Sequence, residues 1–320
     1  MSYVLPYASR STSRGGCSIP VRGPLRIEDE LIHALDYLYS KGIIINQFHL
    51  TATTTGASET VSIARLTTYY DTTIDWGDGS APETLVANVT TARTHVYATA
   101  GTYPITVNHA HLITQLQVDN AKLGGLDTAE LKYSRITHFL VTLATGCTID
   151  SADMVDWRPT YWRLNSMPTG TYSISSADMV DWRPTTWYLY LMPTGTYSIS
   201  SADMVDWRPT DWRLNSMPAA GSSYSFAASC MRNWTNINTL KLENMGLPDA
   251  TVDAILMDIY AGLAGFTAAA PTLAIGGTNA APSGTYQDPP GAPASGLEAV
   301  WEMTHDDKPW TVAATGGSYP

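Results

Sequence analysis

The chain has 320 residues and a formal net charge of −11, and 44% of its residues are hydrophobic. The acidic balance argues against nucleic acid as a partner, because nucleic-acid binding needs a basic face. Three widely separated cysteines, Cys17, Cys147 and Cys230, exclude a disulfide framework and indicate synthesis in a reducing compartment. The sequence has no window of 18 apolar residues, so we expect no membrane insertion.

Residues 1–26 are rich in Ser, Gly and Arg and contain no acidic residue. They also lack the long apolar run of a secretory signal. A segment of this composition does not order itself, so we expect other contacts to hold it. Two interpretations stay open: an arm that anchors the protein to a larger particle through Arg10, Arg14 and Arg22, or an arm folded back on its own domain.

The next segment, 27–41, has the spacing of a helix. Leu31, Leu35 and Leu38 fall on one face, acidic residues occupy the first turn, and Lys41-Gly42 is a stop signal. Two runs rich in Ile, Val and Thr follow, and they predict strands over 42–53 and 59–67.

A turn motif comes next, and a second motif is linked to it. The turn is Asp75-Trp76-Gly77-Asp78-Gly79, and the second motif runs from His95-Val-Tyr97 to Gly101-Thr-Tyr103. Together they resemble the polycystic-kidney-disease (PKD) domain, over residues 43–108. That resemblance implies an immunoglobulin-like β-sandwich with a binding or spacer role. Asp75 and Asp78 allow a Ca²⁺ site, but we favour turn-forming acids that accept backbone N–H groups.

A 25-residue unit then occurs three times, beginning at Ser151, Ser176 and Ser201. A fixed period of this length predicts a solenoid. From the start of each copy to Pro168, Pro193 and Pro218 the copies differ at four positions only. These are Tyr161/Thr186/Asp211, Arg163/Tyr188/Arg213, Asn165/Tyr190/Asn215 and Ser166/Leu191/Ser216.

The copies lie within a longer array of strand-like units, which we expect to span residues 109–247. The units begin at Leu116, Phe139, Trp162, Trp187, Trp212 and Leu240. Their spacing resembles that of leucine-rich repeats, in which each coil gives one short strand to a parallel sheet. Six strands at about 4.8 Å spacing predict a sheet roughly 24 Å wide.

Residues 248–320 predict a C-terminal cap with helices at 248–260 and 297–303 and strands at 272–275 and 310–312. The run from Leu240-Lys-Leu-Glu-Asn to Gly276-Gly-Thr-Asn279, with Trp310-Thr-Val after it, resembles the tail of leucine-rich-repeat proteins of phage virions and bacterial surface adhesins. The order of the modules is also typical of them. The expected fold is mainly β: an arm (1–26), a helix and PKD-like sandwich (27–108), a leucine-rich-repeat-like solenoid (109–247) and an α/β cap (248–320).

Alternation along the repeat strands separates a core side from an outer side. If Trp162 and Leu164 face the core, the variable positions face outward, since the opposite register would bury unpaired charges such as Arg163. We call this outer side the repeat face, with an expected apolar centre at Tyr188, Tyr190 and Leu191. Neutral drift is the alternative explanation for the variation. The candidate binding residues are Tyr161, Arg163, Asn165, Thr186, Tyr188, Tyr190, Leu191, Asp211, Arg213 and Asn215.

Some residues recur at the same position in all three copies, and for these columns of residues we favour a structural explanation over a binding one. Tryptophans at 157/182/207 and 162/187/212 could stack sugars, but we expect core packing. Aspartates at 153/178/203 and 156/181/206 could hold Ca²⁺, but Arg158 and its equivalents can balance them. His109 and His111 share a face if they lie on a strand, yet no third metal ligand is apparent. We expect no cofactor, no metal and no catalytic residues.

These features lead to one main hypothesis and two alternatives. The main hypothesis is a non-enzymatic virion protein of a tailed phage (a tail, fibre or decoration subunit), assembled in the host cytoplasm. Its expected partners are other virion proteins, copies of itself, and a host surface protein or glycan. The alternatives are a bacterial cell-surface adhesin and a purely structural subunit of a homo-oligomer.

Overall fold

The computed structural model describes Ala34 and residues 46–218, 221–226, 229–307 and 309–319. The arm with Arg10, Arg14 and Arg22 lies outside the described residues, as does the helix expected over 27–41 apart from Ala34. Strands make up 37% of the structure and helices 18%, so the expectation of a mainly β protein is confirmed.

Residues 47–108 form antiparallel strands, and a short strand at 123–124 joins them. One sheet has the order β5-β4-β7-β1-β9, and a second consists of β2 and β6. Their hydrophobic residues alternate toward the interior, as in β1, where Phe48, Leu50 and Ala52 are buried. The strands are β1 (Gln47–Thr54), β2 (Glu59–Ile63), β4 (Thr72–Asp75), β5 (Glu83–Leu85), β6 (Arg93–Tyr97), β7 (Gly101–Asn108) and β9 (Leu123–Gly124).

The single strand expected over 59–67 is wrong. The chain bends at Ala64, and β3 (Arg65–Thr68) joins a different sheet from β2. There β3 pairs antiparallel with β8 (Ile113–Val118). One long sheet therefore begins before residue 108 and continues after it.

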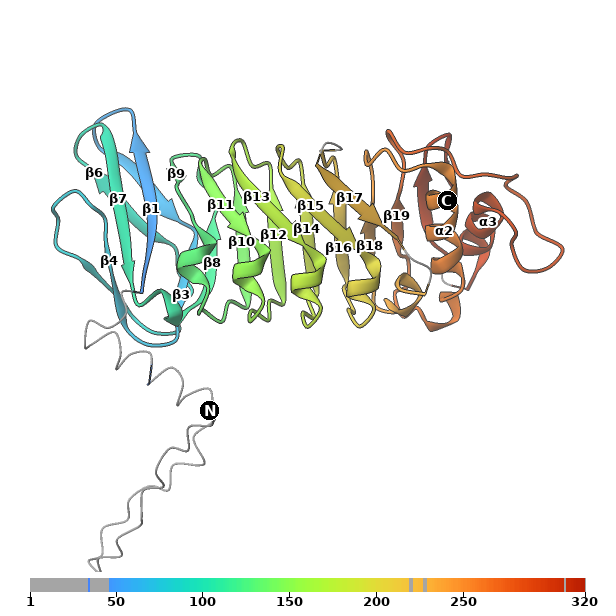
Figure 1. Ribbon diagram of the computed structural model, residues 1–320, viewed down its shortest axis with the longest axis horizontal. Coiled ribbons are helices and arrows are strands. Elements are labelled where there is room, and N and C mark those ends of the chain that lie inside the picture. The colour runs from blue at the N-terminus through green and yellow to red at the C-terminus, as the bar shows by residue number, and fades with distance from the viewer. Residues whose placement is uncertain (1–33, 35–45, 219–220, 227–228, 308, 320) are drawn as a thin grey trace, which may run out of the picture. The chain divides into compact units, whose positions relative to one another are not determined.

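That long sheet has ten strands in the order β21-β20-β19-β18-β16-β14-β12-β10-β8-β3 (Figure 1). All six predicted repeat strands are present and parallel, with Trp162, Trp187 and Trp212 in register. Two cap strands extend the parallel run, and β3 and β21 flank it antiparallel. The remaining strands are β10 (His138–Thr142), β12 (Tyr161–Asn165), β14 (Thr186–Tyr190), β16 (Asp211–Asn215), β18 (Thr239–Lys241), β19 (Thr272–Ala274), β20 (Thr311–Ala314) and β21 (Gly317–Tyr319).

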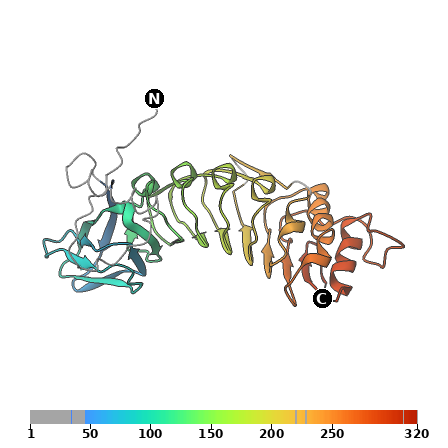
Figure 2. The same cartoon turned by 90° about the horizontal axis from the view of Figure 1, so that it is seen from below.

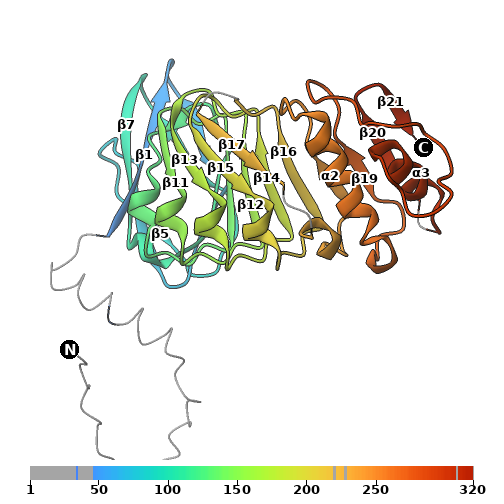
Figure 3. The same ribbon diagram turned by 45° about the vertical axis from the view of Figure 1, so that its right-hand side comes forward.

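Each copy gives one strand to the long sheet, as expected, and also contributes a second strand that sequence reasoning did not predict. The second strands form a four-stranded parallel sheet in the order β11-β13-β15-β17 (Figure 3). Alternation explains them, because Tyr172 and Ile174 are buried while the residues between and beside them are more exposed. The strands are β11 (Cys147–Asp150), β13 (Gly170–Ser175), β15 (Thr196–Ser200) and β17 (Ser222–Ser225).

Short 3₁₀ turns lead into the strands of the long sheet (Figure 2). In the copies each turn has the sequence Ser-Ala-Asp-Met, with its Ser and Met buried. One coil is therefore a 3₁₀ turn, a strand of the long sheet and a strand of the second sheet. The turns are η1 (Ala110–Leu112), η2 (Thr128–Leu131), η3 (Ser151–Met154), η4 (Ser176–Met179), η5 (Ser201–Met204), η6 (Met231–Asn233) and η7 (Leu263–Gly265).

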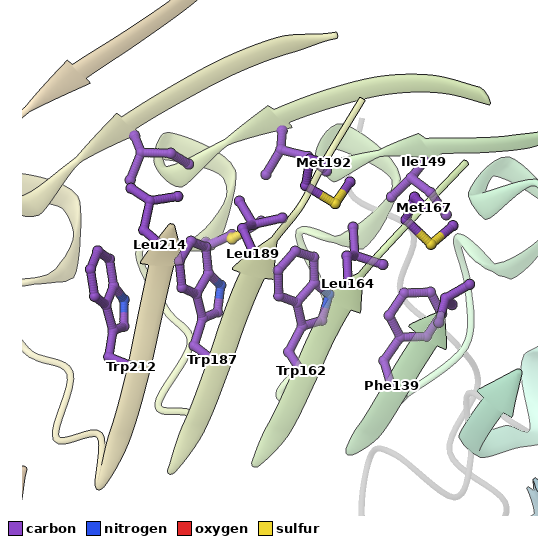
Figure 4. Close-up of a cluster of buried hydrophobic side chains, with 14 of the residues drawn as sticks. Phe139, Ile149, Trp162, Leu164, Met167, Trp187, Leu189, Met192, Trp212 and Leu214 are labelled. Atoms are coloured by element: carbon purple, nitrogen blue, oxygen red, sulfur yellow. The ribbon is translucent and has the colours of Figure 1, made fainter. Parts of the chain in front are cut away.

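Tryptophans fill the space between the two sheets (Figure 4). Trp187 stacks on Trp162 and Trp212, with ring centroids 5.5 and 5.1 Å apart, and its edge meets Trp207. All six repeat tryptophans have 0% exposure, so the prediction of core packing is confirmed. Sugar stacking on these rings is excluded by the same burial.

Polar contacts also recur between neighbouring coils. The Ser176 hydroxyl donates to Asp203, 2.5 Å away, and accepts the Ser200 backbone N–H. The preceding coil repeats this arrangement with Ser151, Asp178 and Ser175. At both of these steps a buried hydroxyl therefore finds a donor and an acceptor, which avoids the cost of an unsatisfied polar group.

The last strands are covered by α2 (Asp249–Tyr260) and α3 (Gly296–His305), which contact each other. Buried Asp258 of α2 accepts the backbone N–H groups of Cys230 and Met231 and pairs with Arg232 at 2.7 Å. Buried Asn279 accepts the N–H groups of Met245 and Leu247. These two side chains join the cap to the end of the array.

Candidate binding site on the repeat face

The repeat face consists of rows that run across neighbouring strands. Arg163, Tyr188 and Arg213 are register partners on β12, β14 and β16, and Lys241 of β18 continues their row. They alternate with fully buried tryptophans and leucines, so these side chains point away from the core. The outward direction predicted for the variable positions is confirmed.

Tyr188 forms the centre of this row between two guanidinium groups. The Arg163 Cζ lies 5.2 Å from the ring centroid of Tyr188 and the Arg213 Cζ lies 4.5 Å from it. Both distances fall within the range of cation–π attraction. The ring is only 9% exposed. The expected apolar centre is therefore wrong for Tyr188, because charged groups cover both of its faces.

Asp211 fixes the geometry of this cluster. It accepts two hydrogen bonds from Arg213, each of 2.9 Å, from Nε and Nη2, and a third from the hydroxyl of Tyr188. Burial and then this carboxylate raise the pKa of Tyr188, while the bond to Asp211 raises the pKa of Arg213. Tyr188 therefore stays neutral and Arg213 stays cationic across the physiological range.

A pocket of ≈ 250 Å³ opens beside the cluster. Five predicted face residues line it together with two that the prediction did not include. Sequence alternation could have predicted these two, Lys241 and Glu243, because they alternate with the buried Leu240 and Leu242. The lining residues are Arg163, Tyr188, Tyr190, Arg213, Asn215, Lys241 and Glu243.

The other predicted face residues lie outside the lining. Tyr161 stacks on His138 with ring centroids 4.5 Å apart, and Thr186 is its register partner on β14. Asn165 accepts a hydrogen bond from Ser166. Leu191 follows the end of β14 with a positive φ of 50° and is 45% exposed. Asp211 does not line the pocket but contacts two residues that do, Arg213 and Tyr188.

The aspartate columns have protein partners of their own. Asp178 and Asp203 accept serine hydroxyls, and Asp181 lies 3.5 Å from Arg158 of the preceding coil. Within the described part of the chain, no group of three His, Cys, Asp or Glu side chains is placed to hold a metal ion. These protein partners account for the aspartate charges without a bound Ca²⁺ ion.

The motif at 75–79 forms a turn held by its own side chains. Asp75 accepts the Gly77 N–H at 2.9 Å and Asp78 accepts the Ser80 N–H at 3.0 Å. Asp78 also meets the ring of His95, which stacks on Trp76. The hydrogen bonds from Ser80 and His95 hold the pKa of Asp78 well below its usual range. This geometry matches the favoured turn interpretation.

The expectation that His109 and His111 share a strand face is wrong. His109 adopts a left-handed conformation before the 3₁₀ turn Ala110–Leu112, and His111 lies within that turn. Their rings are edge to face, with centroids 6.0 Å apart. The left-handed residue ends the β7 alternation, and the short-range pattern did not predict this.

Comparison of the chain with protein-family models, with curated protein sequences and with solved structures gave no match. Over the described residues, no helix is both long enough and apolar enough to cross a membrane.

Proposed function

We propose that the protein is a non-enzymatic binding protein whose repeat face contacts a ligand. The observation that carries this proposal is the position of the sequence differences among the copies. The tryptophan core and the serine–aspartate contacts repeat without change, whereas the changes at 163, 188, 190, 213 and 215 meet at one pocket. Neutral drift would also change exposed positions of the second strands, yet in copies one and two these strands are identical, with Thr171 matching Thr196, and only copy three departs after Pro218.

The proposal includes the finer description of the fold. The antiparallel strands of residues 47–108 and the Asp75–Gly79 turn support a PKD-like, immunoglobulin-like sandwich. The parallel strands at a 25-residue spacing support a leucine-rich-repeat-like solenoid, with α2 and α3 in its cap. Concave faces of such arrays commonly bind partners.

The proposed setting is a tailed-phage virion, in which the protein is a tail, fibre or decoration subunit. Support for it comes from the order of the modules and from the arginine-rich segment 1–26, which would attach to other virion proteins. Mass spectrometry of purified particles tests the setting. Absence of the protein from particles that are otherwise complete would refute it.

A double change, Tyr188→Ala with Tyr190→Ala, tests the binding role. It removes the centre of the cluster and one wall of the pocket, so attachment of the labelled protein to host cells should fall about tenfold or more. Tyr133→Ala is the matched control, because Tyr133 is 63% exposed and lies off the repeat face. Circular dichroism confirms folding of each variant.

The same variants separate the two alternatives. A structural subunit of a homo-oligomer would lose assembly in the double variant, as measured by analytical ultracentrifugation, while attachment per assembled particle stayed unchanged. A bacterial cell-surface adhesin would be found on intact cells of the producing bacterium and would be absent from particles. Loss of attachment in particles that assemble normally favours the proposal over both.

A further inference from the structure

We propose that the pocket on the repeat face binds the carboxylate of an acidic sugar, such as a hexuronic acid unit of a surface glycan. This inference rests on the proposed binding function and names the chemical class of the ligand. Its basis is a local excess of unpaired cationic donors in a chain whose net charge is −11.

The first step is the charge of the pocket. Arg213 and Lys241 are direct register partners on adjacent strands. Like charges placed opposite each other destabilise a sheet. Asp211 offsets Arg213, but its carboxylate is already engaged by Arg213 and Tyr188. A bound anion between these strands would relieve the remaining repulsion.

The second step is the availability of donors. Arg163 stacks on Tyr188, yet neither Arg163 nor Lys241 has a hydrogen bond or ion pair with any residue that the structure describes. The Nε of Arg163 is buried and has no hydrogen-bond partner in the described part of the chain. Stacking restricts the guanidinium while leaving its N–H groups unused. A planar carboxylate matches such a fork with two parallel hydrogen bonds.

The third step distinguishes a sugar acid from a phosphate. Glu243 also lines the pocket, and it repels a doubly charged phosphate more strongly than a singly charged carboxylate. Tyr190 offers an aromatic surface to the C–H face of a sugar ring. Asn215 is only 8% exposed, and its amide oxygen has no partner among the described residues, so a sugar hydroxyl can supply one.

The size of the pocket agrees with one sugar unit. Its ≈ 250 Å³ lies below the range of about 300–1,000 Å³ that holds drug-sized ligands. A longer glycan would therefore place one acidic unit in the pocket and lie across the neighbouring strands with the rest.

The test uses the full chain, two sugar probes that differ only in the carboxylate, and inorganic phosphate as a third probe. Saturation-transfer NMR and calorimetric titration compare methyl glucuronoside with methyl glucoside, each up to about 20 mM. We expect the glucuronoside to bind with a Kd of roughly 0.1–5 mM and the glucoside at least about tenfold more weakly, a difference of about 1.4 kcal/mol. Raising the NaCl concentration should weaken the glucuronoside further, because charge attraction is screened.

Three variants locate the site. Arg163→Gln and Lys241→Gln should each weaken glucuronoside binding about tenfold, because each removes a cation from the pocket. Lys132→Gln is the control, since Lys132 is exposed away from the pocket and should leave binding unchanged. Near-ultraviolet circular dichroism shows whether each variant keeps the native packing.

The outcomes separate this inference from the proposed function. Equal binding of the two sugars, no binding at 20 mM, or tighter binding of inorganic phosphate would overturn the inference. If the wild type still attached to cells in those cases, and the double tyrosine variant did not, the proposed function would stand alone. The opposite result is also informative. If the protein bound the glucuronoside through Arg163 and Lys241 but did not attach to cells, the pocket's ligand preference would be supported and the adhesion role refuted.

Discussion

The strands of residues 47–108 and the three 25-residue copies are stabilised in different ways. In the first region each specific contact occurs once, as in the stack of Trp76 on His95 and the hydrogen bond from the Tyr97 hydroxyl to the Trp76 carbonyl. In the copies a contact made by one coil is made again by the next, as with Ser151–Asp178 and Ser176–Asp203. The stability of the first region therefore depends on individual contacts. The stability of the copies depends on the column of stacked tryptophans and repeated serine–aspartate contacts, which passes from coil to coil without interruption.

The largest expected effect comes from interrupting the column with Trp187→Ala. Trp187 stacks on a tryptophan on each side, so its loss leaves a cavity that neither neighbour can fill. We expect a loss of about 3–5 kcal/mol in the free energy of unfolding. Urea denaturation followed by circular dichroism measures it.

Trp301→Ala is the control for that change. Trp301 is part of α3, is partly exposed and, among the described residues, stacks on His305 alone, so its loss should cost clearly less. Equal losses from the two variants would contradict the idea that the column carries the stability of the copies.

A smaller effect is expected in the turn of the first region. Gly77 has φ 77°, and a Cβ there would lie 2.1 Å from the Pro104 carbonyl oxygen, whereas Gly79 has φ 84° and open space. Gly77→Ala should cost about 3 kcal/mol and Gly79→Ala only about 1 kcal/mol. Thermal unfolding of the two variants measures the difference. Similar midpoints would mean that the backbone conformation, and not the close approach, sets the cost.

The smallest effect concerns His138 on β10. Its neighbouring strand, β8, pairs with β3 of the first region. Burial, and then the charge of Arg65 on β3, lowers the pKa of His138 to about 4. The unfolded chain, with its ordinary pKa near 6.5, therefore takes up a proton first, and stability falls as pH drops from about 6.5 to about 4. The Tm of His138→Gln should fall less than that of the wild type between pH 7 and pH 5.

Glu59 titrates in a lower range and serves as the internal reference for that measurement. The bond to Lys122 lowers the pKa of Glu59 to about 2, so its contribution is present above pH 4.5 and is lost below it. Wild type and His138→Gln should therefore behave alike below pH 4. An equal fall of Tm in both proteins between pH 7 and pH 5 would refute the assignment to His138.

Sequence reasoning predicted the features that local alternation determines. Trp162 and Leu164 determined the inward side, and the variable positions were then necessarily outward. Lys241 was within reach of the same argument, but its coil departs from the 25-residue pattern. The second strands were missed, although Tyr172 and Ile174 alternate, because the Gly, Thr and Ser residues around them are equally typical of turns.

Other features depend on residues far apart in the sequence. The pairing of β3 with β8 joins Leu66 to Leu116, and no pattern within either strand specifies the other. The cover of Tyr188 by two arginines depends on the register of three strands, each 25 residues from the next. Alternation predicts the direction of a side chain, but its contacts depend on which strand lies next to it.

The identity of the contacts between coils has a genetic consequence. Near-identical stretches of DNA can misalign during recombination, and such an event adds or removes whole 25-codon units. Removing copy two would bring Ser151 against Asp203 and Trp162 against Trp212, which are the same pairs of residue types as before. The same event would delete Tyr188 and Tyr190 and place Arg163 beside Arg213. A single recombination can therefore exchange the outer surface of the array in one step while its interior keeps the same packing.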